Sequence, residues 1–337
     1  MEKIRVALIG FGLSGRYLQA PFFTNHPDFL LKKVFTNNQE PEKIFPQVKK
    51  VTELSEILHD PDIDLVSICT PGATHFELAL QVLRAGKHLL VEKPFTPTVK
   101  EANTLIDLAK SLNKYLFVFQ NRRFDSDFLT VRKIIEHGWL GDLLRFEAHY
   151  DRFKPVLNTK KWKETPAPAN GILYDLGAHI IDQSIALFGK PLAVWGESYT
   201  QRAGSAIEDA FDIRLDYGRL KVHLSSSLMV REPLPRYVLH GTKGSFVKYG
   251  IDVQEDHLKA GLLPDMPGFG VESAEFQGIL NTETAGLSFR GKVETLPGEW
   301  KNLFQNIADV LLRGTDPVVA LEDIVTQIGI IEQVSAG

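Results

Sequence analysis

The first third of the chain alternates apolar segments with amphipathic ones, and this alternation restricts the fold more than any other feature. The apolar segments have the length of strands, which we expect at Ile4–Ile9, Leu30–Phe35, Leu65–Cys69, His88–Val91 and Tyr115–Phe119. Helical spacing of apolar residues predicts helices between them, at Ser14–Ala20, Leu54–Leu58, Thr74–Ala85 and Val99–Ser111. Strands that are apolar on both faces belong to a parallel sheet covered by helices on both sides. This part of the chain therefore predicts an α/β domain with a doubly wound parallel sheet.

A glycine-rich turn joins the first expected strand to the first expected helix. It consists of Gly10-Phe11-Gly12-Leu13-Ser14-Gly15. Between a strand and a helix, a G-x-G-x-x-G pattern is typical of a Rossmann dinucleotide site. Gly10 permits the tight turn, Gly12 lets a pyrophosphate approach the backbone, and Gly15 allows the helix to pack closely on the strand. The helix N-terminus would face the phosphates, so we expect all six residues at the cofactor.

The end of the second expected strand indicates which dinucleotide is bound. It reads Val34-Phe35-Thr36-Asn37-Asn38, where an NAD site normally places Asp or Glu to hold the ribose hydroxyls. A neutral end does not repel a 2′-phosphate, so Thr36 and Asn37 favour NADP. No arginine stands at this position to bind that phosphate, and NAD stays an alternative. Lys43 could reach the phosphate from the following segment.

A chain of 337 residues is more often two domains than one. Strand-like runs punctuated by Gly and Asp dominate the second half, at Leu143–Tyr150, Ala193–Thr200, Ala210–Leu215, Leu220–Ser225 and Tyr237–His240. We therefore expect a Rossmann dinucleotide-binding domain at 1–121 and a substrate-binding and oligomerisation domain at 122–337. The segment 261–298 is rich in Gly and Pro, which predicts an extended loop region near the sheet edge or an oligomer contact.

The tripeptide Glu92-Lys93-Pro94 follows the fourth expected strand. Ligands bind at the carboxyl ends of the strands in an open α/β sheet, which is where Lys93 stands. An ammonium group there could hydrogen-bond a reacting oxygen and stabilise its alkoxide character. Elsewhere in the chain an exposed surface lysine would be the ordinary interpretation.

Asp175 and His179 lie four residues apart in the run 172–188, which has helical apolar spacing. Residues i and i+4 share one face of a helix, so the carboxylate and the imidazole can point into one pocket. Imidazole suits a proton acceptor near neutral pH, although an ordinary pair on a helix surface is the alternative. Asp182 could orient the His179 ring. No His-x-x-x-His motif or Cys cluster accompanies these residues, so we expect no metal.

Together these motifs resemble those of the Gfo/Idh/MocA family of oxidoreductases. The resemblance covers essentially the whole chain, because the glycine-rich turn, Glu92-Lys93-Pro94 and Asp175…His179 fall in the family's order and spacing. A closer likeness is to the NADP-dependent scyllo-inositol dehydrogenases within the family. The segments that carry it are Gly12–Arg16, Asn121–Asp125, Leu173–Gln183, Phe246–Asp252 and Gln254–Asp256.

The resemblance implies a second domain of α/β type with a large, open, mostly antiparallel sheet, and homodimers or homotetramers packed through that sheet. It implies that His179 is the general base toward the reacting hydroxyl. It also implies that Asp175 positions the substrate or Lys93, and that the Lys93–Pro94 bond is cis.

Further cofactor residues follow from the resemblance. Thr70, Pro71, His75 and Glu92 would line the cofactor, and Asn121 would approach the nicotinamide. For His75, packing at the start of the helix is the alternative.

The substrate side contains residues whose interpretation is open. Tyr174 offers a hydroxyl suited to a polyol. Arg122 and Arg123 would contact the substrate or pair with surface acids. Trp162 could stack near the nicotinamide ring or anchor a surface loop.

Composition excludes several classes of protein. The formal net charge of −4, without a Lys/Arg block, gives no general attraction to nucleic acid. No apolar run approaches about 18 residues, so no transmembrane helix is expected. The N-terminus leads directly into a strand and lacks a signal-peptide core. The single cysteine, Cys69, excludes an intrachain disulfide, and a cytoplasmic setting is expected.

We therefore expect an NAD(P)-dependent dehydrogenase that acts on a CH–OH group of a cyclic polyol or sugar, with scyllo-inositol and the inosose as the candidate pair. The cofactor would exchange the hydride, and the protein would supply the base. Two alternatives are a dinucleotide-binding sensor that has lost catalysis and an NAD-dependent glycosidase. The presence of both Lys93 and His179 favours the enzyme over the sensor.

Overall fold

The computed structural model describes residues 3–336, without the side chains of Trp162 and Thr284, and the chain divides into two units. The first unit comprises Met1–Asn121, Gln254–Phe269 and Glu299–Val325. The second comprises Arg122–Val253, Gly270–Gly298 and Thr326–Gly337. Two segments beyond residue 121 thus belong to the first unit, whereas the sequence analysis placed them in the second domain. The assignment of cofactor and substrate binding to these parts stays a prediction.

The first unit is built on a six-stranded sheet in the order β3-β2-β1-β4-β5-β6, in which every neighbouring pair is parallel. Its strands are β1 (Ile4–Ile9), β2 (Phe29–Phe35), β3 (Lys49–Val51), β4 (Leu65–Ile68), β5 (His88–Val91) and β6 (Leu116–Val118). The sequence predicted all of them except β3, a short edge strand that contains two lysines and therefore no apolar run. This order confirms the expected Rossmann topology. The order in which strands are added changes side between β1 and β4, with β2 and β3 on one side and β4, β5 and β6 on the other.

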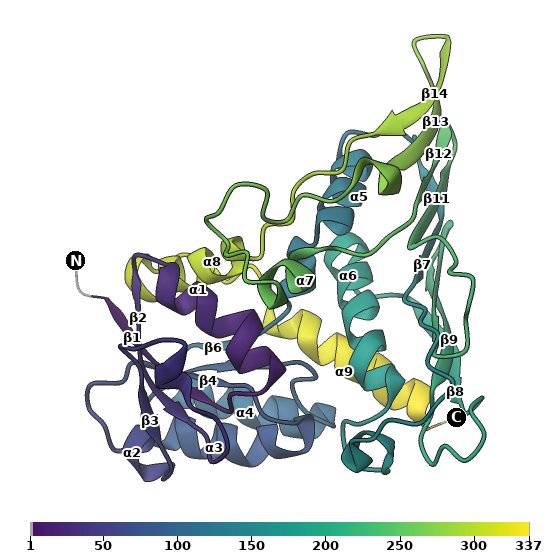
Figure 1. Cartoon of the computed structure of the whole chain (residues 1–337). Coiled ribbons are helices and arrows are strands. Elements are labelled where there is room, and N and C mark those ends of the chain that lie inside the picture. The colour runs from purple at the N-terminus through teal and green to yellow at the C-terminus, as the bar shows by residue number, and fades with distance from the viewer. Residues whose placement is uncertain (1–2, 337) are drawn as a thin grey trace. The chain divides into compact units, whose positions relative to one another are not determined.

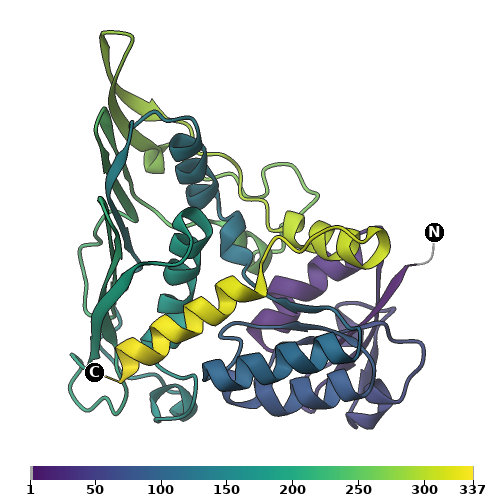
Figure 2. The same ribbon diagram turned by 180° about the vertical axis from the view of Figure 1, so that it is seen from behind.

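Helices cover both faces of this sheet. They are α1 (Ala20–Asn25), α2 (Ser55–Leu58), α3 (His75–Arg84), α4 (Val99–Ser111), α7 (Gln254–Lys259) and α8 (Lys301–Arg313). Figures 1 and 2 show α3 and α4 side by side on one face of the sheet, with α1 and α8 on the other. The segment Ser14–Gln19, predicted as an α-helix, is a π-helical turn that leads into α1.

The second unit contains an eight-stranded sheet in the order β14-β13-β12-β11-β7-β10-β9-β8. Its strands are β7 (Leu143–His149), β8 (Ala193–Tyr199), β9 (Ala210–Tyr217), β10 (Leu220–Ser227), β11 (Tyr237–Gly241), β12 (Gly244–Lys248), β13 (Gly278–Thr284) and β14 (Leu287–Val293). Only β7 and β10 are parallel neighbours; the other neighbouring pairs are antiparallel. The expected large, mostly antiparallel sheet is therefore confirmed.

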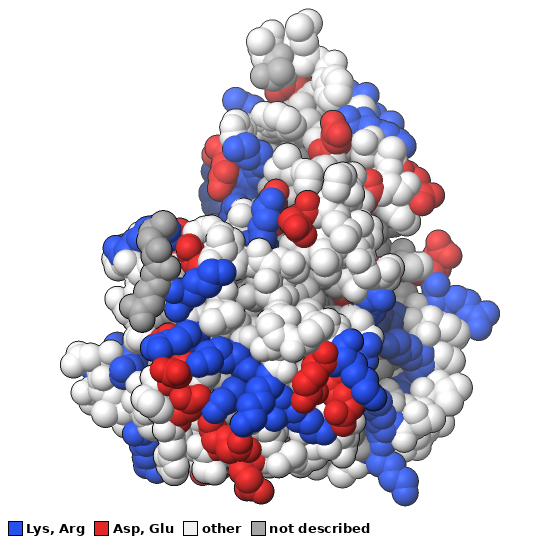
Figure 3. Space-filling model, turned by 60° about the vertical axis from the view of Figure 1, so that its left-hand side comes forward, with Lys and Arg blue, Asp and Glu red and all other residues white. Residues whose placement is uncertain are grey.

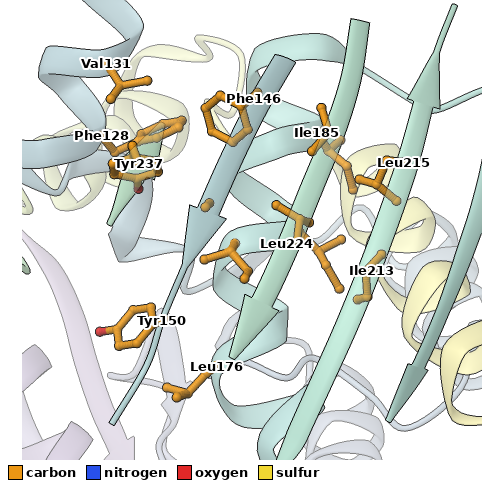
Figure 4. Packing of buried hydrophobic residues seen from close by; sticks show 14 of the residues in the cluster. Phe128, Val131, Phe146, Tyr150, Leu176, Ile185, Ile213, Leu215, Leu224 and Tyr237 are labelled. Carbon is orange, nitrogen blue, oxygen red and sulfur yellow. The ribbon is translucent and has the colours of Figure 1, made fainter. Parts of the chain in front are cut away.

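Helices α5 (Ser126–Glu136), α6 (Ala178–Phe188) and the end of α9 (Leu321–Ser335) pack on one face of this sheet. The core between them contains alternate residues of the strands, among them Phe146, Leu215 and Tyr237, together with Ile185 of α6 (Figure 4). Within the described part of the second unit, no helix packs on the opposite face of the sheet, beside which only a loop runs (Figure 2). One face is therefore packed and the other is bare, as is common for antiparallel sheets.

The prediction of an extended loop over 261–298 was wrong for its second half, which forms the β13–β14 hairpin. The hairpin turns at Ala285 and Gly286, where both φ angles are positive, at 51° and 76°. This is the geometry of a two-residue type I′ turn. Apolar residues alternate with polar ones in β14, at Leu287, Phe289 and Val293, although Leu287 and Phe289 are exposed. The sequence analysis missed this local strand signal.

Candidate active site

The glycine-rich turn leaves β1 at the point where the strand order reverses, which is where open α/β sheets bind ligands. Gly10 has a φ of 97°, and a Cβ there would lie 3.0 Å from the Cys69 carbonyl oxygen and 3.0 Å from Thr70 Cγ2. A Cβ at Gly15 would overlap the Gly10 carbonyl oxygen. These two positions therefore need glycine to form the turn and to bring the following helix against it.

Gly12 is different, because a Cβ there would meet nothing within 4 Å. It is exposed beside the exposed Leu13, whereas Phe11 is buried and packs edge-on against Phe45. The chain thus leaves open space over the one glycine that the fingerprint assigns to the pyrophosphate. A dinucleotide fits this turn, since its phosphate could approach the backbone there.

The end of β2 is neutral in charge. The backbone N–H of Thr36 donates to the Val51 carbonyl oxygen at 3.1 Å, and Asn37 is exposed. The nearest acid along the chain, Glu40, forms an ion pair with Lys50 at 2.9 Å, and this contact lowers the pKa of Glu40. The nearest acid in sequence after this strand end is therefore balanced by a cation.

Glu92 and Lys93 follow β5 in the same unit. Glu92 is buried, and its Oε1 accepts hydrogen bonds from Ser14 Oγ and from Gln19 Nε2, the latter at 2.9 Å. Its Oε2 accepts from the Lys93 backbone N–H at 3.1 Å, and burial raises the pKa of Glu92. Lys93 is half-buried, and the Lys93–Pro94 bond is cis, as the resemblance implied. The lysine is thus joined through Glu92 to the first turn of the helix that follows the glycines.

Of the remaining predicted cofactor residues of this unit, Thr70 and Pro71 follow β4, His75 begins α3, and Asn121 follows β6. Thr70 Oγ1 lies 2.7 Å from Thr74 Oγ1, and Pro71 is exposed. His75 has an exposed fraction of 0% and Asn121 one of 3%. His75 therefore offers no surface to a bound cofactor, which leaves an indirect role.

In the second unit, Tyr174 and Asp175 lie in a π-helical turn, Leu173–Gly177, that leads into α6. The predicted helical run is confirmed, with a π-helical first turn; such turns occur frequently at functional sites. The Asp175 backbone N–H donates to the Gly171 carbonyl oxygen at 3.0 Å. Asp175 is exposed and Tyr174 half-buried, while His179, in the first turn of α6, is 5% exposed.

Asp182 and the two arginines after Asn121 form buried ion pairs. Arg123 binds the Asp182 carboxylate in a bidentate fashion, at 2.9 and 2.8 Å. Arg122 Nη1 donates to Asp125 Oδ2 at 3.2 Å. Both arginines thus pair with buried acids of their own unit, rather than with the surface acids that the alternative interpretation named.

The sequence analysis missed several side chains beside these residues. The Tyr150 ring lies 6.5 Å from the His179 ring, and the Arg236 guanidinium lies 4.4 Å from the centre of the Tyr150 ring. The Glu208 carboxylate occupies the space where a Cβ of Gly171 would lie, and burial raises the pKa of Glu208. None of the three stands in a motif, so no sequence signal identifies them.

Trp162 lies in a short 3₁₀ turn, Lys161–Glu164, and its side chain is outside the described residues. Its predicted stacking on the nicotinamide therefore stays a prediction.

Comparison with known proteins shows which family has these features. Residues 4–120 match the family model described as "Oxidoreductase family, NAD-binding Rossmann fold", and residues 128–247 match "GFO/IDH/MocA C-terminal domain". The chain is 38% identical to scyllo-inositol 2-dehydrogenase (NADP(+)) IolW of Bacillus subtilis, over 98% of this chain and 93% of the relative. The chain belongs to the Gfo/Idh/MocA family.

Other members of the Gfo/Idh/MocA family are equally similar. An uncharacterized oxidoreductase of Schizosaccharomyces pombe, C26H5.09c, is 40% identical over 94% of this chain and 91% of its own length. The solved structure of the oxidoreductase yvaA from Bacillus subtilis has a TM-score of 0.95 at 37% identity, covering 98% of this chain and 95% of that one. These matches establish an oxidoreductase family with a nicotinamide-binding Rossmann fold and sugar or inositol dehydrogenases among its members.

Several further features bear on what this Gfo/Idh/MocA protein binds. Within residues 3–336, no helix has the length and apolar content required to cross a bilayer. No group of three or more metal-ligating side chains occurs in the same described part. Cys69 is buried, and burial raises the pKa of its thiol, which disfavours the reactive thiolate. On the face shown in Figure 3, basic and acidic side chains lie next to one another.

Proposed function

We propose that this protein is an NADP-dependent dehydrogenase that exchanges a hydride with a CH–OH carbon of a cyclic polyol or sugar. The observation that carries the proposal is the pairing, in one unit, of an open glycine turn at the switch point with Lys93, which is joined to that turn through Glu92. IolW is named as a scyllo-inositol 2-dehydrogenase, so scyllo-inositol is the first candidate substrate. Levoglucosan dehydrogenase, 30% identical over 58% of this chain, makes an anhydrosugar the second.

The reaction needs a hydride acceptor and a base. The bound nicotinamide supplies the hydride chemistry. The Lys93 ammonium hydrogen-bonds the reacting oxygen and stabilises its developing negative charge. The His179 imidazole takes the hydroxyl proton, and the exposed Asp175 carboxylate accepts a hydrogen bond from a neighbouring hydroxyl. In the reverse direction the same groups return the proton to a ketone.

The remaining predicted residues divide between the two ligands. We assign Thr36, Asn37, Thr70, Pro71 and Asn121 to the cofactor. On the substrate side, we assign Tyr174 and Arg122 to polyol hydroxyls. Tyr174 is half-buried next to Asp175, and the Arg122 guanidinium lies 5.5 Å from the centre of the Tyr150 ring, which in turn lies 6.5 Å from the His179 ring.

The preference for NADP follows from charge. An acid at the end of β2 would repel a 2′-phosphate, and the nearest one in sequence, Glu40, is paired with Lys50. The exposed Lys43, in the turn Pro41–Lys43, could bind the phosphate. The expected result is a Kd for NADP⁺ at least tenfold below that for NAD⁺, measured by calorimetric titration of the protein with each cofactor.

The function is tested with a substrate panel of scyllo-inositol, myo-inositol, levoglucosan and D-glucose, followed by NADPH or NADH absorbance. Lys93→Met should lower kcat by about 10²–10⁴, the range for loss of an acid–base group, while the Kd for NADP⁺ stays within about twofold. Lys100→Met, at an exposed position of α4, is the matched control and should leave both values unchanged. Tight NADP⁺ binding without turnover of any panel member would favour the sensor, and sugar release without net NADPH change would favour the glycosidase.

We also propose that a second copy packs against the bare face of the eight-stranded sheet. Val238, Val247 and Ile279 lie opposite one another on neighbouring strands β11, β12 and β13. Their neighbours in sequence, Leu239 and Phe246 among them, point into the core, so these three point to the bare face. An apolar row across three strands suits an interface between copies.

A further inference from the structure

His75 ties together the ends of two neighbouring strands in the first unit. Its Nδ1 lies 2.8 Å from the Pro94 carbonyl oxygen, and its Nε2 lies 2.8 Å from the Thr70 carbonyl oxygen. Thr70 follows β4, and Pro94 follows Lys93 after β5. The ring is completely buried, so no water competes for these two backbone contacts.

The backbone of Lys93 is therefore held on both sides by buried polar side chains. On the N-terminal side, Glu92 Oε2 accepts the Lys93 N–H at 3.1 Å. On the C-terminal side, the His75 ring meets the Pro94 carbonyl oxygen. A buried hydrogen bond of this kind is costly to lose, because the partner that remains is left without water. The arrangement fixes the point from which the lysine side chain starts.

A neutral His75 ring cannot donate a hydrogen bond in both of these contacts. A neutral imidazole carries one N–H, so it can donate to only one of the two carbonyl oxygens. Burial lowers the pKa of His75, against the opposing effect of its backbone contacts with Thr70, Pro94 and Phe95. The position of the remaining proton then decides which strand end is held by a true hydrogen bond, and only a proton on Nδ1 holds Pro94.

We propose that His75 is a positioning residue, which donates a hydrogen bond from Nδ1 to the Pro94 carbonyl oxygen and so fixes Lys93 for catalysis. The inference rests on the proposed function only where it concerns turnover. The position of the proton is a property of the protein itself.

Two isosteric variants separate the two contacts. In His75→Asn the side-chain amide nitrogen takes the place of Nδ1 and can still donate to Pro94. In His75→Gln the amide nitrogen takes the place of Nε2 and can donate only to Thr70, and His75→Leu donates to neither. With scyllo-inositol and NADP⁺, we expect His75→Asn to keep kcat within about threefold of the parent protein. His75→Gln and His75→Leu should lose about 30-fold or more, since displacement by about 1 Å can cost 10²-fold. The Kd for NADP⁺ should stay within about twofold in all three variants.

A merely structural role would lower stability in all three variants without separating Asn from Gln in kcat. Equal kcat values for His75→Asn and His75→Gln would therefore overturn the proposal, and so would a Gln variant more active than the Asn variant. If His75→Leu fails to fold, the Asn and Gln pair alone carries the comparison.

A second measurement does not depend on turnover. Nitrogen NMR of the ¹⁵N-histidine-labelled protein, with His75→Asn used to assign the signal, reports which ring nitrogen carries a proton. A proton on Nδ1, alone or together with one on Nε2, supports the proposal. A ring protonated only at Nε2 overturns it. Failure of the parent protein to oxidise any panel substrate would sink the proposed function and leave this result unaffected.

Discussion

At the level of single residues, Gly12 and Gly15 have opposite surroundings within one turn. Gly12→Ala adds a methyl group to open space, so the protein should keep its free energy of unfolding while the Kd for NADP⁺ rises tenfold or more, which is about 1.4 kcal/mol. Gly15→Ala overlaps the Gly10 carbonyl oxygen and should lower the free energy of unfolding by about 1–3 kcal/mol. Urea unfolding and NADP⁺ titration of both variants measure these effects. Parent-like NADP⁺ binding by Gly12→Ala would remove this glycine from the phosphate site.

His88 gives the stability of the first unit a dependence on pH. Its Nδ1 accepts the Tyr115 backbone N–H at 3.0 Å, and burial, with the charge of Lys114, lowers the pKa of His88 from 6.5 to about 4. As the pH falls below 6.5, the unfolded chain takes up the proton before the folded protein does. The stability is therefore complete above pH 6.5 and is lost progressively toward pH 4.

His88→Asn tests this dependence, because its amide oxygen can still accept the bond but cannot be protonated. Urea unfolding at pH 7 and pH 5 should show a smaller loss of stability at pH 5 in the variant than in the parent protein. His137→Asn, at an exposed histidine, is the matched control and should keep the parent slope. An unchanged slope in His88→Asn would contradict the assignment.

Among the elements, the short turn Asn121–Phe124 is joined to α6 by the Arg123–Asp182 pair. Both side chains are buried, and removing one partner leaves an uncompensated charge. Arg123→Met should therefore lower the free energy of unfolding by about 3–5 kcal/mol, measured by urea unfolding. The double variant Arg123→Met with Asp182→Leu should recover most of this loss, since no buried charge remains. A loss below about 1 kcal/mol in Arg123→Met would show that the pair is not sealed from water.

The elements of the first unit were predictable where local signals agree. Helix α4 was predicted with the bounds observed, Val99–Ser111, because apolar spacing coincides with an N-cap in which Thr98 Oγ1 accepts the Glu101 N–H at 3.2 Å. Strand β3 and the β13–β14 hairpin escaped prediction. Strand β3 is only three residues long and begins with two lysines, so it has no apolar strand signal of its own. The hairpin lies in a segment rich in Gly and Pro, and the composition of that segment outweighed the alternation of apolar residues in β14.

The residues of the candidate site likewise divide into those that the sequence predicted and those that it did not. Gly10, Gly12, Gly15 and Lys93 could be predicted because a turn or a strand end requires those residue types at those places. For His75 the sequence left cofactor contact and packing at the helix start open, since its hydrogen bonds depend on carbonyl oxygens contributed by two strand ends. The surroundings of His179 could not be predicted either, because Tyr150 follows the end of β7 and Arg236 precedes the start of β11.

At the level of the whole molecule, the bare sheet face makes a prediction about assembly. Sedimentation of the parent protein should give a dimer or tetramer. Val247→Glu places a charge in the apolar row of β11, β12 and β13 and should shift the protein to a smaller species, because burying an unpaired charge is costly. Lys110→Glu, on an exposed position of α4, is the control and should sediment as the parent does. A Val247→Glu protein with the parent's mass would place the interface elsewhere.

Helix α8 belongs to the first unit although it lies near the C-terminal end of the chain. Its Phe304 stacks on Phe22 at 4.6 Å and lies edge-on to Phe23 at 5.0 Å and to Phe119 at 5.8 Å. During synthesis on the ribosome, nearly the entire polypeptide has to be made before Phe304 can pack against those three earlier aromatic rings. A fragment ending at Asn121 would carry the complete sheet yet leave these rings in water, and it should aggregate when expressed alone.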